Sequence, residues 1–200
     1  SSLERKTLLA SGVAISLAIY SPDGSRIVTC AEDAAVRVWD SSTSREMALL
    51  KGHRAQVLAA AFSADGRWLA TGGKDRGVRL WDADSWECAR VLEGSEGDIY
   101  CVAFSPDAQL LLATSETLAE GDPRGSVRVY AVNDGALRLP VLRHEKEVYW
   151  ACFSPDGARI LSACYDGTAS EWDAATGRKL LDLRGHAGYW KGCRKADYHP

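Results

Sequence analysis

The chain of 200 residues is long enough to bury a sizeable core in a single domain. Its 24 Lys and Arg residues stand against 27 Asp and Glu residues, and the net charge of −3 argues against a general binder of polyanions. No apolar run reaches the roughly 18 residues that predict a membrane-spanning helix, and the polar opening Ser-Ser-Leu-Glu-Arg-Lys lacks the apolar region of a signal peptide. We expect a segment of a longer chain.

Short apolar runs separated by tight turns follow one another along the chain. Four of them end in an aromatic residue and a Ser-(Pro/Ala)-Asp turn, at Tyr20, Phe62, Phe104 and Phe153, with spacings of 42, 42 and 49 residues. A second aromatic series stands at positions 39, 81, 130 and 172. The runs are rich in Val, Leu and Ala, which predicts short strands covered on both faces. In the second repeat we expect strands at about 56–62, 67–71, 77–81 and 88–92.

The second repeat, from His53 to Asp82, is the most complete. It starts with Gly52-His53 and ends with Trp81-Asp82, with a Ser-Ala-Asp-Gly turn between them. A Gly-His pair, a Trp-Asp pair and a period near 42 residues resemble the WD-repeat family. The resemblance implies an all-β fold, a β-propeller of four-stranded antiparallel blades. It places the outer strand of a preceding blade at 3–9, blades at about 10–50, 51–92, 93–142 and 143–183, and the start of a further blade at 184–200.

Four full repeats with parts of two more fall short of a full ring, because propellers of this family commonly have seven blades. We therefore expect an incomplete ring. An open ring exposes the apolar faces of its first and last blades, which favours association. The remainder of the propeller is expected to come from the same chain or from a partner.

By the same resemblance, a loop His, a strand hydroxyl, a turn Asp and a strand Trp form a hydrogen-bonded tetrad within a blade. Physical reasoning supports such a network, because a buried indole N–H needs an acceptor and a hydroxyl supplies one. The His, hydroxyl and Asp could also be interpreted as a hydrolase triad, but a triad repeated in several blades has no evident use. We therefore predict that the segment is not an enzyme. The predicted structural tetrads are His53, Thr71, Asp75 and Trp81, and His144, Ser162, Asp166 and Trp172.

The first and third repeats depart from this pattern. Ala10-Ser11 and Gly94-Ser95 stand in place of Gly-His, and the third repeat has Ala113 for the hydroxyl and Tyr130 for the Trp. The third repeat also has a longer turn after its second strand, and we expect a ten-residue loop over 116–125. A loop of that length is more often functional than idle. These changes indicate a blade stabilised by other packing or reshaped for a partner.

In the family, side chains on one rim of the propeller commonly bind peptides. Mapped onto these repeats, the rim positions include three tyrosines in the third and fourth repeats, which we expect to cluster on one arc. Aromatic residues flanked by charges are typical of protein interfaces, and a basic or amphipathic segment would suit this arc. The predicted partner-binding residues are Gln56, Leu58, Lys74, Asp98, Tyr100, Asp122, Arg124, Glu147, Tyr149 and Tyr165.

Other chemistry has weaker support. His186, Cys193 and His199 do not have the spacing of a standard metal site, and Gly72-Gly73-Lys74 lacks the rest of a phosphate-binding loop. Basic residues near Trp190 could hold single-stranded nucleic acid, but such a footprint should extend over a whole face. We predict no metal, no cofactor and no nucleic-acid partner.

The six cysteines form no Cys-x-x-Cys pair and lie mostly in apolar runs, as small buried residues do. They favour a reduced, cytoplasmic compartment. The predicted function is a non-catalytic scaffold that binds protein partners within a larger assembly. The alternative is a propeller attached to an enzyme or to a nucleic-acid-binding machine whose active part lies outside these residues.

Overall fold

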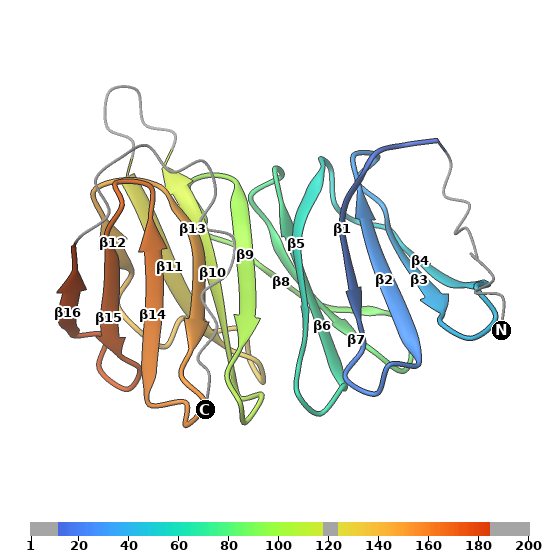
Figure 1. Ribbon diagram of the computed structural model, residues 1–200. Helices are drawn as coiled ribbons and strands as arrows, with labels where there is room; N and C mark the ends of the chain where they lie inside the picture. The colour runs from blue at the N-terminus through green and yellow to red at the C-terminus, as the bar shows by residue number, and fades with distance from the viewer. Residues whose placement is uncertain (1–11, 118–123, 185–200) are drawn as a thin grey trace, which may run out of the picture.

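The computed structural model describes residues 12–117 and 124–184, which form four antiparallel sheets of four strands each. The sheets stand side by side in an open arc, with the first and the fourth at its ends (Figure 1). Within these described ranges there is no helix, and so none that could cross a membrane. The predicted all-β class and the incomplete ring of four-stranded blades are therefore confirmed.

Each sheet is a meander in which strands that follow one another in the chain are neighbours. The first sheet contains β1 (Ile15–Tyr20), β2 (Arg26–Ala31), β3 (Val36–Asp40) and β4 (Glu46–Leu50). The second contains β5 (Val57–Phe62), β6 (Trp68–Gly73), β7 (Val78–Asp82) and β8 (Cys88–Leu92). The third contains β9 (Ile99–Phe104), β10 (Leu110–Thr117), β11 (Arg124–Ala131) and β12 (Leu142–His144). The fourth contains β13 (Val148–Phe153), β14 (Arg159–Cys164), β15 (Ala169–Asp173) and β16 (Lys179–Leu183).

The apolar core lies between neighbouring sheets. Successive side chains of a strand point to opposite faces, and β7 shows the consequence. Leu80 packs with Ile99 and Leu111 of the third sheet, whereas Trp81 packs with Val38 of the first sheet. A third cluster joins the third and fourth sheets in the same way. Both faces of an inner sheet are therefore buried, which explains the nearly continuous apolar runs of the sequence.

The two glycines at the end of β6 serve this close packing. Gly72 and Gly73 are buried in the strand. A Cβ atom on Gly72 would lie 2.4 Å from Cγ2 of Ile99 in the next sheet, so no larger residue fits there. The weak likeness to a phosphate-binding loop is thus explained by sheet packing.

The Ser-(Pro/Ala)-Asp turn has one geometry in all four sheets. In the second sheet the Ser63 hydroxyl donates to the Asp65 carboxylate (2.6 Å) and accepts from the backbone N–H of Trp68 (3.0 Å). The same Ser–Asp bond recurs in the other three turns. Three of the turns place a glycine at a φ near +71°, but the third has Ala108 at +57°, a conformation that is strained for a residue with a Cβ.

The edge that carries the entry loops of β5, β9 and β13 is the upper rim in Figure 1. Just below this rim, the first strand of every sheet contains a β-bulge, because its pairing with the second strand skips one residue. A bulge leaves its residue out of the ladder and re-aims the side chain. The skipped residues occupy equivalent positions: Ser16, Leu58, Tyr100 and Tyr149.

The connection between β10 and β11 differs from the predicted ten-residue loop. Both strands are longer than their counterparts, and the ladder continues to the pair of Thr117 with Arg124. The loop predicted over 116–125 is therefore wrong at both ends, because continued pairing satisfies backbone groups that a loop would leave open. Residues 118–123, with the predicted Asp122, lie outside the described residues.

Large apolar side chains are exposed at both ends of the arc. In β1, Ile15 and Tyr20 are exposed, Tyr20 by 66%, and in β16 so are Leu181 and Leu183. Exposed apolar faces on terminal sheets agree with an open ring. That further blades or a partner cover them stays a prediction.

Candidate partner-binding rim and the networks beneath it

A chain of hydrogen bonds runs through the second sheet beneath the upper rim. The indole Nε1–H of Trp81 donates to Oγ1 of Thr71 (2.8 Å), which lies 2.8 Å from Nε2 of His53. Nδ1 of His53 lies 2.9 Å from Oδ1 of Asp75, and that carboxylate also accepts from Arg79 at 2.9 Å. A neutral His53 with its proton on Nδ1 accepts from Thr71 and donates to Asp75, so every member is satisfied.

The electrostatics agree with a neutral His53. Burial lowers the pKa of its imidazole below the usual value, although the neighbouring Asp75 opposes the shift. Burial works to raise the pKa of Asp75, but the hydrogen bond from His53 and the backbone N–H of Arg54 lower it by more. Thr71 is completely buried, so its hydroxyl is out of reach of a substrate. This arrangement suits a stabilising network better than a catalytic triad.

The fourth sheet forms only part of the predicted tetrad. Nε1 of Trp172 donates to Oγ of Ser162 (2.8 Å), and that Oγ lies 2.9 Å from Nε2 of His144. Asp166 forms no hydrogen bond with His144. Its carboxylate accepts instead from the backbone N–H and the hydroxyl of Thr168, at 2.8 and 2.6 Å. Asp166 is therefore corrected from a member of the network to a residue of the adjacent turn.

The reason lies on the neighbouring strand. In the second sheet, Arg79 of β7 donates to Asp75 and holds it toward His53. The equivalent residue of β15 is Ser170, whose hydroxyl donates to Asp182 instead. Without that cation, Asp166 satisfies itself locally. Burial, with a smaller effect of Lys179, lowers the pKa of His144 to about 4, so this His is also neutral.

The first sheet shows the same strand position without a His. Nε1 of Trp39 donates to Oγ1 of Thr29 (2.9 Å). Arg37 pairs with Asp33 at 2.8 Å, as Arg79 pairs with Asp75 in the second sheet. The Arg two residues before the strand Trp is thus a partner of the turn Asp in both sheets.

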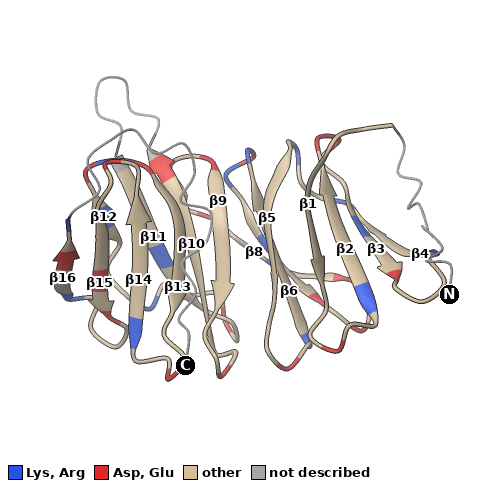
Figure 2. Ribbon diagram, viewed as in Figure 1, with Lys and Arg blue, Asp and Glu red and all other residues tan. Residues whose placement is uncertain are grey.

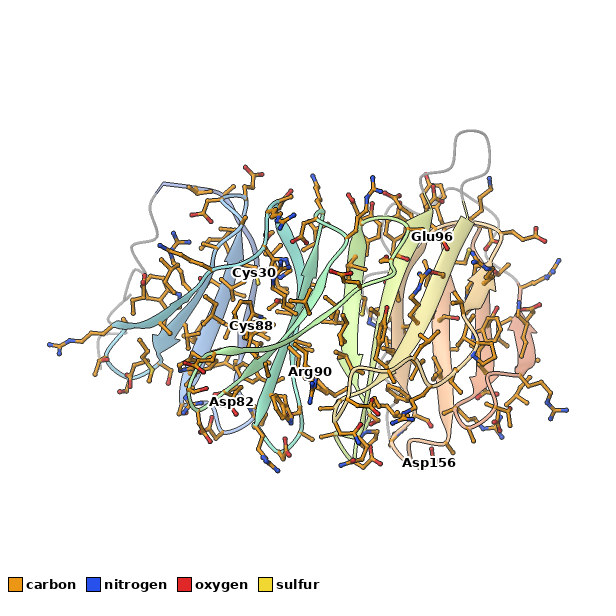
Figure 3. The ribbon with its side chains drawn as sticks, turned by 180° about the vertical axis from the view of Figure 1, so that it is seen from behind. Cys30, Asp82, Cys88, Arg90, Glu96 and Asp156 are labelled. Carbon is orange, nitrogen blue, oxygen red and sulfur yellow. The ribbon has the colours of Figure 1, made fainter. Side chains whose placement is uncertain are left out.

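The third sheet contains a different network, which the sequence interpretation missed. The buried Arg128 donates to Oγ of Ser126 (2.8 Å) and to Oε1 of Glu96 (3.2 Å), and the hydroxyls of Ser115 and Ser126 lie 3.0 Å apart. Glu96 lies at the upper end of this sheet (Figure 3). The network therefore attaches the entry loop of β9 to β10 and β11, in a sheet that lacks the loop His.

A signal for this network was present in the sequence. Arg128 precedes Tyr130 by two residues, the spacing that separates Arg79 from Trp81. The Tyr130 hydroxyl donates to the carbonyl of Glu93 at 3.3 Å, because no strand hydroxyl is available at Ala113. The Arg position could have been found by aligning the repeats, but its acidic partner in the entry loop could not.

The three rim tyrosines are in contact with one another. The rings of Tyr100 and Tyr149 have centroids 4.9 Å apart, and those of Tyr149 and Tyr165 are 5.8 Å apart, tilted by 59° and 67°. Tyr100 and Tyr149 are the bulged residues of β9 and β13, whereas Tyr165 follows β14 and donates its backbone N–H to the carbonyl of Glu147 (2.8 Å). The structure thus brings these predicted rim residues together, with Tyr149 and Tyr165 exposed by 38% and 36%.

Carboxylates surround this tyrosine cluster. Burial raises the pKa of the Tyr100 hydroxyl, and the nearby Glu116 and Asp98 raise it further. Burial also raises the pKa of Tyr149, with added effects of Glu147 and Glu116. Acidic segments line the upper edge of the third and fourth sheets (Figure 2). The rim therefore combines aromatic surface with negative charge.

The remaining rim residues are more scattered. Gln56 and Leu58 are half-buried and Lys74 is exposed, and the N–H of Lys74 donates to the carbonyl of Gln56 (2.9 Å). Arg124 opens β11, and its backbone pairs with Thr117. Only the third and fourth sheets gather the predicted residues into one surface.

The opposite, lower rim contains a hollow of about 320 Å³. It is lined by the ends of β5, β9 and β13, with Phe62, Phe104, Trp150 and Phe153 among its walls and no charged side chain. Three of these aromatics belong to the repeated turns, so the turns themselves account for the hollow. In the ranges that the structure describes, no group of three or more His, Cys, Asp or Glu side chains could hold a metal ion.

The repeated four-stranded blades and their Trp–hydroxyl networks define a repeat protein of the propeller class. The model of the WD domain, G-beta repeat, matches residues 5–40, 44–82, 86–130 and 137–173. These matches cover more than half of the chain, which therefore belongs to the WD-repeat family. The later three matches each begin before the last strand of one sheet and end with the third strand of the next.

The following individual proteins match parts of the chain. Over 47 residues the chain is 51% identical to apoptotic protease-activating factor 1 of Mus musculus and of Rattus norvegicus, a match of 24% of this chain and 4% of each relative. Over 85 residues it is 32% identical to the chromatin assembly factor 1 subunit FAS2 homolog of Oryza sativa subsp. japonica, a match of 40% of this chain and 17% of the relative. The chain thus spans a small part of the relatives that it matches.

Proposed function

We propose that this chain is a non-catalytic scaffold that holds protein partners in a larger assembly, and that a partner binds the upper rim of the third and fourth sheets. WD-repeat domains typically mediate protein interactions. The observation that carries the choice of rim is the contact of Tyr100, Tyr149 and Tyr165 across two adjacent sheets. Tyrosine is enriched at protein interfaces because it offers a large apolar ring with a polar end.

The cluster is supported by rigid elements. Tyr100 and Tyr149 belong to β9 and β13, the innermost strands of their sheets, which contact each other directly. Side chains held on packed strands lose little freedom when a partner binds, so more of the contact energy appears as affinity. The bulges keep both rings at the rim rather than in the ladder.

Two further observations are consistent with this proposal. One relative is by its name a subunit of chromatin assembly factor 1, which supports a role within an assembly. Cys30, Cys88, Cys101 and Cys164 are free thiols, which supports the proposed reducing, cytoplasmic compartment.

The test uses the full-length protein and its variants Tyr149→Ala and Tyr165→Ala. Proteins that co-purify with the wild type are quantified, and the most abundant one is produced pure for direct titration. Each variant is expected to weaken that binding by about 1–3 kcal/mol, as central aromatic anchors do, with little change in melting temperature. Tyr20→Ala is the matched control, because Tyr20 is an exposed tyrosine at the far end of the arc.

Unchanged affinity in both rim variants would refute this location of the site. So would a photo-crosslinker that captures the pure partner from the lower rim, near Phe104, but not from position 165.

A further inference from the structure

We propose that the tyrosine cluster binds the cationic side chain of a lysine or arginine in a basic partner segment, between its rings and the carboxylates of Glu116 and Glu147. This inference rests on the proposed protein-binding rim and names the chemistry of the group that the rim receives. Three observations carry it: the arrangement of the rings, an unsatisfied carboxylate oxygen, and the gathering of like charges beside exposed aromatic surface.

The rings present faces that a cation can approach. The Tyr100–Tyr149 and Tyr149–Tyr165 ring pairs are tilted by 59° and 67°, so neither pair is a parallel stack that covers one face of both rings. The exposed fractions of Tyr149 and Tyr165 show that solvent reaches this surface. An ammonium or guanidinium group is attracted to the face of a tyrosine ring, most strongly where water is partly excluded.

One carboxylate oxygen near Tyr149 lacks a hydrogen-bond partner. Oε2 of Glu147 is buried and has no hydrogen bond in the structure. A buried carboxylate oxygen without a donor costs free energy, so such an atom calls for a reason. The backbone N–H of the neighbouring Tyr165 donates a hydrogen bond to the backbone carbonyl of Glu147 and not to its carboxylate. Glu147 as a residue is only half-buried, so a turn of its side chain toward the rim would let a cationic donor from a partner satisfy this oxygen.

The negative charges around the cluster repel one another. Burial raises the pKa of Glu116 and the neighbouring Asp98 and Glu147 add to the rise, although a hydrogen bond with Tyr100 opposes it. Within the described part of the chain, none of these three carboxylates forms an ion pair. A bound cation would relieve this repulsion, whereas a phosphorylated or acidic segment would add to it. The surface therefore favours a basic segment over an acidic one.

The experiment measures binding of defined peptides to the full-length protein by fluorescence anisotropy. The probe is a labelled twelve-residue peptide of Gly and Ser with three lysines, compared with versions in which the lysines are replaced by arginine or by acetyl-lysine. We expect the Lys or the Arg peptide to bind saturably with a Kd below about 1 mM. Its affinity should exceed that of the acetylated peptide by about tenfold or more. The tighter of the two cationic peptides identifies the preferred group.

Variants locate the binding. Tyr149→Leu and Glu147→Gln should each weaken binding of the cationic peptide about tenfold, whereas Tyr149→Phe keeps the ring face and should weaken it less than about threefold. Tyr20→Leu should have no effect. Circular dichroism and melting curves establish that each variant is folded.

Failure of this inference can be told apart from failure of the proposed function. If the pure partner binds at position 165 but the acetylated peptide binds as well as the Lys and Arg peptides, the rim is a protein site without cation recognition. Absence of saturable binding for both cationic peptides, or binding unchanged in Tyr149→Leu and Glu147→Gln, also overturns the inference.

Discussion

The second and third sheets attach their entry loops to the buried strands through different side chains. In the second sheet, His53 links the entry loop to Thr71 and Trp81, and Asp75 completes the network. The third sheet has no loop His, and Arg128 links the entry loop through Glu96 instead. In both, a loop side chain gives the buried members of the network their partners, which stabilises them in the core.

The difference shows which part of the repeat is interchangeable. An Arg at the same position of the third strand is present in both sheets, as Arg79 and Arg128, but it pairs with the turn Asp in one and with a loop Glu in the other. The loop and turn residues exchange roles around this cation. A blade can therefore lose the residues by which the repeat is recognised and still anchor its rim.

The largest effect that separates the sheets should come from Thr71→Val. This variant leaves the Trp81 indole N–H and Nε2 of His53 without partners, and we expect a loss of about 2–4 kcal/mol in the free energy of unfolding. Thr29→Val in the first sheet orphans only the Trp39 indole and should cost about 1–2 kcal/mol. Urea denaturation measures both. Equal losses of unfolding free energy in the two variants would mean that the hydrogen bond between Thr71 and His53 does not stabilise the protein.

The network of the third sheet should depend mainly on Arg128. Replacing it by Met keeps much of the packing but removes the donor to Ser126 and Glu96, and we expect a loss of about 1–3 kcal/mol by urea denaturation. Glu96→Gln should cost less than about 1 kcal/mol, because the Glu96 side chain is 39% exposed. A larger loss for Glu96→Gln than for Arg128→Met would contradict the central role of the Arg.

Acid should weaken the sheets that contain a neutral His. The folded pKa of His144, about 4, lies below the 6.5 of an unperturbed His, so the unfolded chain takes up a proton first as the pH falls. Its stabilisation is complete above pH 6.5 and is lost between pH 6.5 and pH 4. At pH 5 the loss relative to pH 7 should be about 2 kcal/mol.

This pH effect is checked by comparing the unfolding free energies of the wild type and His144→Gln at pH 7 and pH 5. The variant should be less stable at pH 7 but lose less between the two values. The lowered pKa of His53 acts in the same direction and remains in both proteins. Identical losses of stability in the two proteins would show that the pKa of His144 is the same in the folded and the unfolded chain.

The smallest effect concerns the turn between β9 and β10. Ala108 has a φ of +57°, where the other three turns have glycine, and Ala108→Gly should raise the melting temperature through a gain of up to about 1 kcal/mol. The reverse change in the second sheet, Gly66→Ala, should cost a similar amount. A loss on Ala108→Gly would mean that the methyl group contributes more by packing than it costs in strain.

The class of fold could be predicted from the sequence alone, although the third blade extends two residues past its predicted end at 142, because β12 runs Leu142–His144. A strand, a tight turn and a strand Trp with its hydroxyl are local features, so their residues recur at a constant spacing wherever a blade forms. Thr71, Trp81 and their counterparts Ser162 and Trp172 could be predicted for this reason. The three rim tyrosines could be assigned to one arc, because neighbouring repeats form neighbouring blades.

How those tyrosines meet, and which acids accompany them, depends on the packing of strands against one another. The bulges at Tyr100 and Tyr149 re-aim both side chains, and a shift of one residue in pairing turns a side chain to the other face of a sheet. The partnership of Arg128 with Glu96 spans 32 residues, and the contacts of Tyr149 with Tyr100 and Tyr165 span 49 and 16 residues. Such pairs form where distant segments pack together, so residue spacing within one repeat carries no record of them.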